Sequence, residues 1–456
     1  MPQLYELTAS ELTELYRSGE VSPVEVAEAC LQRYERHNVA LNAIVALNAS
    51  AVMDAASASR ERWRSSMPLS ELDGIPVTIK DNLVTEGLPA TWGSELFADL
   101  IPEQDELSVA RLRKAGAIIF GKTNVPELAL AGYTSNRLFG ATGNPWDPSL
   151  TPGGSSGGAV AAIMSGMAPI AIATDAGGSI RRPASHAGCV GLKTSIGVVA
   201  RRDGFPALSA DFQTIGPLAR SMADLRNVLT CIRGAPVETP SLDLGGLKVA
   251  AFWEVENSPV DPQIVDSFHA CVEVLRALGI TVSEVPSPCD VNAVGETFLD
   301  IASAGVATVL SEAETNGREV TPAIAAIAER GQSLKASEYV RQMHFVSQFR
   351  WQMHDFFEDW DFLLTPTAAA LPWPKEEPFP RTIGGRQASP RASAVYTTFA
   401  NVAGIPGLSF PFARAQNGLP IGMQLLGPIN SDARLLALGQ RLEDELGWPT
   451  SIAPME

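Results

Sequence analysis

Cysteine and histidine are scarce in this sequence, and their arrangement argues against several kinds of site. The chain of 456 residues has five cysteines, which are odd in number, widely scattered and without a C-x-x-C pair. A disulfide framework and a zinc site are therefore not indicated, and a reducing compartment fits. No H-x-x-x-H pair or carboxylate cluster suggests another metal. We expect no metal and no other cofactor.

Positive charge is in short supply as well. Lysine and arginine number 34 against 51 aspartates and glutamates, so the net charge is −17. This acidity argues against nucleic acid or an anionic membrane surface as the main partner. The first residues have neither the basic segment nor the apolar segment of a signal peptide. We expect a cytoplasmic protein that acts on a small molecule, as a monomer or homodimer.

The sequence also lacks the G-x-S-x-G motif that places a serine beside a histidine base. Four of its five histidines fall on segments with a helical pattern, where a structural role is the simpler interpretation. These four are His37, His269, His344 and His354. The fifth, His186, is close to Ser179 in sequence and is kept as a minor alternative base.

One long stretch lacks charge altogether, because no charged residue stands between Asp147 and Asp175. Glycines interrupt this stretch and its side chains are mostly small, which is not typical of a membrane span. Its pattern predicts structural elements in a definite order. They are a loop over 151–157, a helix over 158–165, a turn at Gly166 and a buried strand over 169–174.

Helix and strand signals alternate along the rest of the chain. Capping boxes begin at Thr8 and at Ser22, and each predicts the start of a helix. Residues 247–285 read as strand, helix and strand. This alternation predicts an α/β fold with a mixed central sheet and helices on both of its faces.

Gly116 to Thr123 matches the phosphate-loop pattern G-x-x-x-x-G-K-[ST]. In a true phosphate loop the four intervening residues form the loop, and a helix begins at the lysine. Here they are the β-forming run Ala-Ile-Ile-Phe, and Pro126 blocks an early helix. Nucleotide binding is therefore only a distant alternative.

A serine without a histidine needs another base, and a neutral lysine can serve. The ordinary lysine pKa of ~10.4 would have to fall by roughly two to three. Burial can supply that change. Lys80 ends the apolar run that begins at Pro76, and open α/β sheets place their sites at the carboxyl ends of strands. The alternative interpretation is a solvent-exposed lysine at the end of a surface strand.

Four motifs follow one another along the chain. They are Gly74-Ile-Pro-Val-Thr-Ile-Lys-Asp-Asn82, Gly153-Gly-Ser-Ser-Gly-Gly158, Asp175-Ala-Gly-Gly-Ser-Ile-Arg181 and Gly188-Cys-Val-Gly-Leu-Lys193. One glycine-serine cluster alone would be weak support, since flexible linkers contain it. Four motifs in this order and spacing resemble the amidase signature family. Weaker similarity covers 216–225, 360–367 and 399–427.

The resemblance implies an α/β fold with a mixed, mostly parallel central sheet covered by helices on both faces. It also implies a Ser-Ser-Lys triad in which Ser179 is the nucleophile, Ser155 relays the proton and Lys80 is the base. A cis peptide bond would precede Ser155. The N–H groups of the turn would form an oxyanion hole. Its members would be Ala176, Gly177, Gly178 and Ser179.

Further residues are expected around this triad. Four would fix its loops, with ordinary turn and surface roles as the alternative. They are Gly154, Ser156, Asp175 and Arg181. Substrate-binding residues are expected in the apolar loop before the central stretch and at the end of its strand. They are Ala129, Leu130, Ala131, Gly132 and Thr174. The segment 367–392 is expected to border the same open, hydrophobic pocket.

The chemistry implied is hydrolysis of an amide bond through an acyl-enzyme, on a hydrophobic or aryl amide. A carbamate or ester is the alternative substrate, because the same attack suits any carbonyl with a leaving group. A glutaminase subunit of an amidotransferase is a more distant alternative. Glutamine-using relatives carry an acidic stretch before Phe399, whereas this chain has Ala392 to Thr398 there, so a free-standing hydrolase is favoured.

Two other departures from the family pattern are visible. Thr194-Ser195 stands where Pro-Thr is usual, and Arg182 stands where a neutral residue is common and could alter the access channel.

The resemblance also suggests one domain with four sections. These are 1–70, an N-terminal helical cover; 71–232, the catalytic core; 233–345, a variable α/β region; and 346–456, the C-terminal completion of the sheet.

Overall fold

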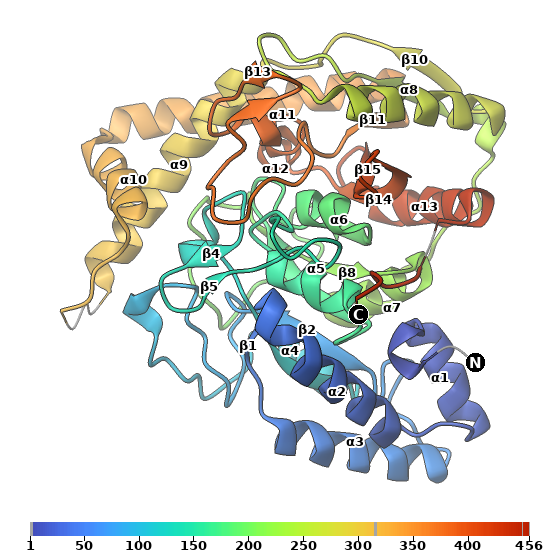
Figure 1. Ribbon diagram of the computed structural model, residues 1–456. Helices are drawn as coiled ribbons and strands as arrows, with labels where there is room; N and C mark the ends of the chain where they lie inside the picture. Colours follow the sequence, from blue (N-terminus) through green and yellow to red (C-terminus); the bar gives the residue numbers. More distant parts are fainter. Residues whose placement is uncertain (1–2, 314–316, 449, 456) are drawn as a thin grey trace.

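The computed structural model describes residues 3–313, 317–448 and 450–455 (Figure 1). Its main sheet has eleven strands, and two small sheets lie outside it. In spatial order the main sheet contains β1 (Ile44–Ala46), β3 (Ile118–Thr123), β2 (Pro76–Lys80), β6 (Ile170–Asp175), β8 (Thr214–Ala219), β7 (Val190–Lys193), β14 (Gly407–Arg414), β15 (Pro420–Leu426), β11 (Phe362–Pro366), β9 (Lys248–Ala251) and β10 (Thr281–Glu284). The small sheets pair β4 (Ser135–Asn136) with β5 (Gly140–Ala141) and β12 (Thr382–Ile383) with β13 (Arg386–Gln387).

Helices surround the main sheet (Figure 1). They are α1 (Ala9–Ser18), α2 (Pro23–Leu41), α3 (Ala49–Arg64), α4 (Leu107–Lys114), α5 (Gly157–Met164), α6 (Arg181–Ala187), α7 (Met222–Arg233), α8 (Pro262–Ala277), α9 (Val291–Glu312), α10 (Pro322–Ser333), α11 (Ala336–Asp359), α12 (Thr398–Ala403) and α13 (Asp432–Leu446). Short 3₁₀ helices include η3 (Glu127–Ala129) and η5 (Ala392–Ala394). Both predicted capping boxes form, with Thr8 and Ser22 as the N-caps of α1 and α2.

Parallel neighbours occur in two blocks of the main sheet. Strands β3, β2 and β6 are parallel to one another, and so are β11, β9 and β10. The strands between these blocks, and β1 at one edge, pair antiparallel. A parallel pair needs a crossover, which α4 supplies between β2 and β3 and α8 between β9 and β10. The predicted mixed sheet is confirmed.

Strand β6 shows why both faces of the sheet need helices. Its residues alternate between two cores, so that Ala171 and Ala173 pack with α5 and α6. Ile170 and Ile172 lie in the other core, together with residues of α7 and α13. A strand buried on both faces reads as a continuous apolar run, which is what the uncharged stretch contains. The prediction of helices on both faces is confirmed.

The elements of the uncharged stretch match those predicted to within one residue at most boundaries. Helix α5 covers 157–164, and β6 begins at Ile170. Gly166 joins them with a φ of 79°, a conformation that favours glycine. The phosphate-loop pattern also behaves as predicted, because 118–123 form strand β3 and the Lys122 side chain is buried.

Two central strands, β7 and β8, were not predicted. Pro217 lies in the middle of β8, opposite Ile172, although proline is typical of edge strands. Gly191 in β7 and Gly216 in β8 weaken the strand pattern further. A side chain at Gly191 would meet Leu218 at 2.8 Å, so the packing of the sheet requires glycine there.

Helix α9 is the one helix in the described ranges that is long and apolar enough to cross a membrane. Half of its most apolar window is buried. It packs along α10 and also contacts α11 and α12, and Figure 1 shows α9 and α10 side by side. These contacts fit a helix of the protein core. The division of the chain into four sections stays a prediction.

Two glycine-to-alanine substitutions in helices test how packing competes with helix propensity. A Cβ at Gly158 would lie 2.4 Å from the Asn124 nitrogen and 2.6 Å from the Ala43 oxygen, whereas nothing lies within 4 Å of one at Gly295. Alanine gains about 0.5–1 kcal/mol in a helix, and a backbone clash costs about 1–3 kcal/mol. Gly295→Ala should therefore stabilise the protein and Gly158→Ala should destabilise it. Urea denaturation of both variants checks this, and a stable Gly158→Ala would contradict it.

Candidate active site

The candidate triad comes from three neighbouring segments. Lys80 ends β2, Thr174 lies near the end of β6, and the parallel pairing of these strands brings both residues to the same edge. Ser155 precedes α5, and Ser179 lies in the turn between β6 and α6. The carboxyl edge of a parallel pair therefore carries the lysine, as the sequence predicts.

Lys80 is fully buried and has three oxygen partners. Its Nζ lies 2.8 Å from the Ser155 Oγ and 3.0 Å from both the Oγ1 and the carbonyl oxygen of Thr174. Burial lowers the pKa of Lys80 to about 7, which the positive charge of Arg201 reinforces and Asp175 opposes. The alternative of a solvent-exposed lysine is therefore wrong.

The three partners suit an uncharged amine. A neutral lysine has two N–H donors and one lone pair. The Thr174 carbonyl oxygen can only accept, and the Thr174 Oγ1 also receives a hydrogen bond of 2.9 Å from Asn82. The two N–H groups can therefore point to Thr174. The lone pair is left for the Ser155 hydroxyl, which can donate its proton to Lys80.

Ser155 and Ser179 lie on adjoining loops. The peptide bond between Gly154 and Ser155 is cis. The Ser156 N–H donates to the Ser179 carbonyl oxygen at 3.2 Å, which ties the two serine loops together. A Cβ at Gly154 would lie 2.5 Å from the Tyr133 oxygen, so only glycine allows this close approach. Ser155 is fully buried, whereas Ser179 keeps 7% of its surface exposed.

The turn around Ser179 offers main-chain donors. The N–H groups of Ala176, Gly177 and Ser179 have no acceptor within the described part of the chain, and all three residues line the cavity described below. The Gly178 N–H instead donates to the Asp175 Oδ1 at 2.7 Å. This corrects the prediction for Gly178, whose N–H supports the turn and is not free for an oxyanion.

A buried ion pair lies beneath the turn. Arg181 contacts Asp175 at 3.1 Å, and both side chains are fully buried. Burial would raise the pKa of Asp175, but Arg181 and Asn401 hold that pKa well below its usual range. Arg181 also donates to Asn401 at 2.6 Å and to Gln424 at 3.2 Å. This network connects the turn to α12 and β15.

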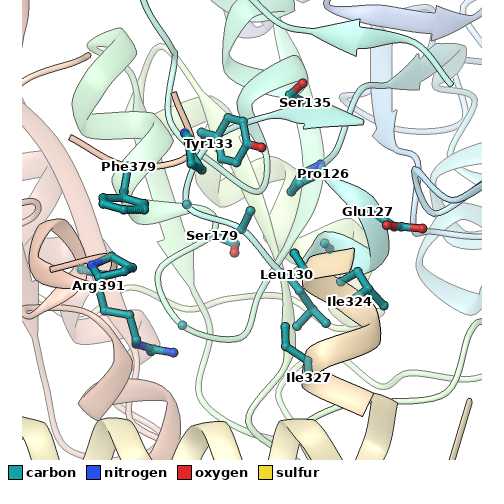
Figure 2. Close-up of a pocket in the computed structure, with 18 of the residues that line it drawn as sticks. Pro126, Glu127, Leu130, Tyr133, Ser135, Ser179, Ile324, Ile327, Phe379 and Arg391 are labelled. Atoms are coloured by element: carbon teal, nitrogen blue, oxygen red, sulfur yellow. The ribbon is translucent and has the colours of Figure 1, made fainter. Parts of the chain in front are cut away.

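A cavity of about 740 Å³ opens beside Ser179 (Figure 2). The predicted residues Ala129, Leu130, Ala131 and Gly132 all line it, as does part of the segment 367–392. Its apolar walls also include residues that the sequence did not single out. They are Phe298, Ile324 and Ile327, whereas Trp373 and Phe379 belong to the predicted segment 367–392. Thr174 does not line this cavity, and its oxygens contact the Lys80 amine instead.

His186 does not line the cavity beside Ser179. Its Nε2 lies 3.0 Å from the Ala370 carbonyl oxygen, and burial lowers its pKa to about 4. Its Nδ1 has no hydrogen-bond partner among the described residues and lies against Gly153, so neither ring nitrogen contacts Ser179 by a hydrogen bond. Within the described residues no cluster of three or more histidine, cysteine, aspartate or glutamate side chains could hold a metal ion.

Comparison with known proteins agrees with this geometry. The family model described as Amidase matches residues 25–436. The chain belongs to the amidase signature family. Its curated relatives include a glutamyl-tRNA(Gln) amidotransferase subunit of Alkaliphilus metalliredigens, which is 33% identical over 98% of this chain and 97% of that protein.

Solved amidase structures share the fold. A crystal structure of an amidase has a TM-score of 0.90, with 29% identity over 97% of this chain and all of that chain. A bacterial aryl acylamidase of the amidase signature family has a TM-score of 0.87, with 24% identity over 97% of this chain and 96% of that chain. The protein is an amidase signature enzyme, and so an amidohydrolase.

The buried Asp175 to Arg181 pair should be important for stability in this amidase signature enzyme. Asp175→Asn removes the charge that compensates Arg181, and an unpaired buried charge destabilises by about 3–5 kcal/mol. The control, Glu445→Gln, removes a carboxylate from an exposed ion pair with Arg441, which contributes less than about 1 kcal/mol. Thermal and urea unfolding compare the two variants. Equal stability of the two variants would contradict the stabilising role of the pair between Asp175 and Arg181.

Proposed function

We propose that this enzyme hydrolyses a carboxylic amide through an acyl-enzyme intermediate on Ser179. The observation that carries the proposal is the 2.8 Å contact between the buried Lys80 amine and the Ser155 hydroxyl. An amine with a pKa near 7 is partly uncharged at neutral pH and can accept a proton. Ser155 then connects this base to the loop that carries Ser179.

In the proposed mechanism Lys80 takes the Ser155 proton while Ser155 takes the Ser179 proton. The Ser179 oxygen attacks the substrate carbonyl carbon, and the oxyanion accepts hydrogen bonds from Ala176, Gly177 and Ser179. Collapse of this intermediate breaks the C–N bond, and the proton on Lys80 returns through Ser155 to the leaving amine. Water then attacks the acyl carbon while its proton passes through Ser155 to Lys80. The return of this proton to the Ser179 oxygen frees the acid and restores the Ser179 hydroxyl.

The cavity supports a substrate with a hydrophobic or aryl group. Leu130, Ile324 and Ile327 lie together on one side of the pocket in Figure 2, and Ser179 lies beside them. Burying such a group stabilises the complex by about 25 cal/mol per Å² of apolar surface. A carbamate or an ester remains the alternative substrate. Turnover of matched p-nitroanilide, carbamate and ester substrates separates these possibilities.

A second candidate function is a role within an amidotransferase complex, because curated relatives carry that name. Free glutamine has an ammonium group that calls for a carboxylate in the pocket. Ser393 and Ala394 line the cavity where the glutamine-using relatives have an acidic stretch. Glu127 also lines it, but its oxygens accept from Ser94 and Thr321. We therefore propose a free-standing cytoplasmic hydrolase, monomeric or homodimeric, that acts on small amides.

Substitution of the triad tests the proposal. Ser179→Ala and Lys80→Ala should each lower kcat/KM for a p-nitroanilide by at least ~10³-fold, because neither variant can form the acyl-enzyme efficiently. Circular dichroism should show an unchanged fold. Lys114→Ala, on the exposed end of α4, should retain wild-type activity. A fluorophosphonate probe should label Ser179 in the wild type, and full activity of either triad variant would refute the mechanism.

The pH dependence follows from the low pKa of Lys80. Below about 7 the amine is protonated and cannot act as a base, and above about 7 it is neutral. Since only the neutral form accepts a proton, kcat/KM should rise as pH increases through 7 and then reach a plateau. Initial rates between pH 5 and 9 measure this curve. A rate that falls over this range would contradict the role of Lys80.

A further inference from the structure

The cavity has a charge opposite to that of the whole protein. The chain has a net charge of −17, yet Arg137, Arg182 and Arg391 line the cavity, and Glu127 is the one acidic residue among its described lining residues. Both Glu127 oxygens are occupied, one by the Ser94 hydroxyl and the other by Thr321. These neutral donors leave the Glu127 charge in place, so the lining has three arginines against one glutamate and carries a net positive charge.

Arg182 is the most unusual of these arginines. Only 7% of its surface is exposed, and its side chain makes no hydrogen bond or ion pair with any residue that the structure describes. The neighbouring Arg181, by contrast, is neutralised by Asp175. Burial lowers the pKa of Arg182 to about 10, which still leaves it charged at neutral pH. A buried cation without a partner is costly, so an anion at this point would stabilise it.

Two glycines define where the Arg182 guanidinium lies. A Cβ at Gly178 would lie 2.8 Å from its Nε, and a Cβ at Gly132 would lie 2.7 Å from its Nη1. The guanidinium therefore fits between the turn that carries Ser179 and the pocket loop that contains Gly132. Any group bound to it would lie close to the carbonyl that Ser179 attacks.

Arg391 provides a second cation from another wall of the cavity. Its guanidinium lies 5.2 Å from the centre of the Phe298 ring and donates to the Thr398 Oγ1 at 3.2 Å. No described carboxylate forms an ion pair with it, and its positive charge lowers the pKa of Arg182. Figure 2 shows Arg391 across the cavity from Leu130, Ile324 and Ile327, with Ser179 between the two sides.

We propose that Arg182 and Arg391 bind a carboxylate carried by the amide substrate. Guanidinium groups match the two oxygens of a carboxylate, and an anion near both arginines would relieve their mutual repulsion. The substrate class is an amide with a carboxylate a few bonds from the scissile carbonyl, such as a half-amide of a dicarboxylic acid. Its apolar part would contact the opposite wall. This inference rests on the proposed amide hydrolysis and names the substrate of the same site.

A matched pair of chromogenic substrates tests the inference. Succinyl p-nitroanilide carries the carboxylate, and 4-methylpentanoyl p-nitroanilide replaces it with an uncharged isopropyl group of similar size. The wild type should favour the succinyl compound by at least ~10-fold in kcat/KM, or about 1.4 kcal/mol. Arg182→Gln should reduce this ratio at least ~10-fold, mainly through KM, and Arg182→Lys should restore part of it.

The control variant is Arg64→Gln, which removes the same charge from an exposed position on α3 and should leave the ratio unchanged. A wild-type preference for the neutral compound would overturn the inference. An equal loss on both substrates in Arg182→Gln would also overturn it, because that result indicates a structural role.

A binding measurement separates this inference from the proposed function. Calorimetric titration of the Ser179→Ala variant with succinyl p-nitroanilide should show binding that Arg182→Gln weakens at least ~10-fold. If this holds although the wild type cleaves neither compound, the carboxylate site stands and amide hydrolysis fails. The opposite result is that the wild type cleaves the neutral compound, while the variant with both Ser179→Ala and Arg182→Gln binds succinyl p-nitroanilide as tightly as Ser179→Ala alone. In that case the carboxylate site fails and hydrolysis stands.

Discussion

A buried lysine amine is stable only if it pairs with a negative charge or loses its proton. The carboxylate that acts on Lys80 is Asp175, which is itself paired with Arg181 at 3.1 Å. Asp175 therefore cannot fully compensate a second cation. Desolvation exceeds its attraction, and the pKa of Lys80 falls to about 7. The base of the proposed reaction therefore arises from the burial of Lys80, which the attraction of Asp175 offsets only in part.

The hydrogen-bond partners distinguish Lys80 from the other buried lysines. Lys122 contacts the carbonyl oxygens of Asp81 and Leu83, and Lys193 contacts those of Thr194 and Ile405. A carbonyl oxygen only accepts, so neither lysine can receive a proton from these partners. Lys80 contacts a serine hydroxyl that can donate. Its position, and not burial alone, suits it to proton transfer.

The sequence predicted the parts of the site that lie within short motifs. Lys80, Ser155 and Ser179 each sit in a local pattern, and the apolar loop before Tyr133 does line the cavity. The Gly178 N–H could not be assigned in the same way. Its partner is a side chain three residues earlier, and the choice between donating to Asp175 and to substrate depends on the geometry of the turn.

Residues far apart in sequence were harder to predict. Phe298, Ile324 and Ile327 reach the cavity from segments more than 100 residues beyond Ser179, and no local pattern marks them as pocket residues. Strand β8 was missed because Pro217 contradicts the usual strand pattern, and only its two neighbours in the sheet explain its place. Arg182 was noticed as an unusual residue, but its lack of a partner could be seen only after folding.

The protonation state of Lys80 tests the central claim most directly. Nuclear magnetic resonance of protein labelled with ¹⁵N-lysine can follow each Nζ during a pH titration, and the signal absent from Lys80→Arg identifies Lys80. The account predicts a titration midpoint near 7. A Lys80 amine that stays protonated above pH 9 would contradict it.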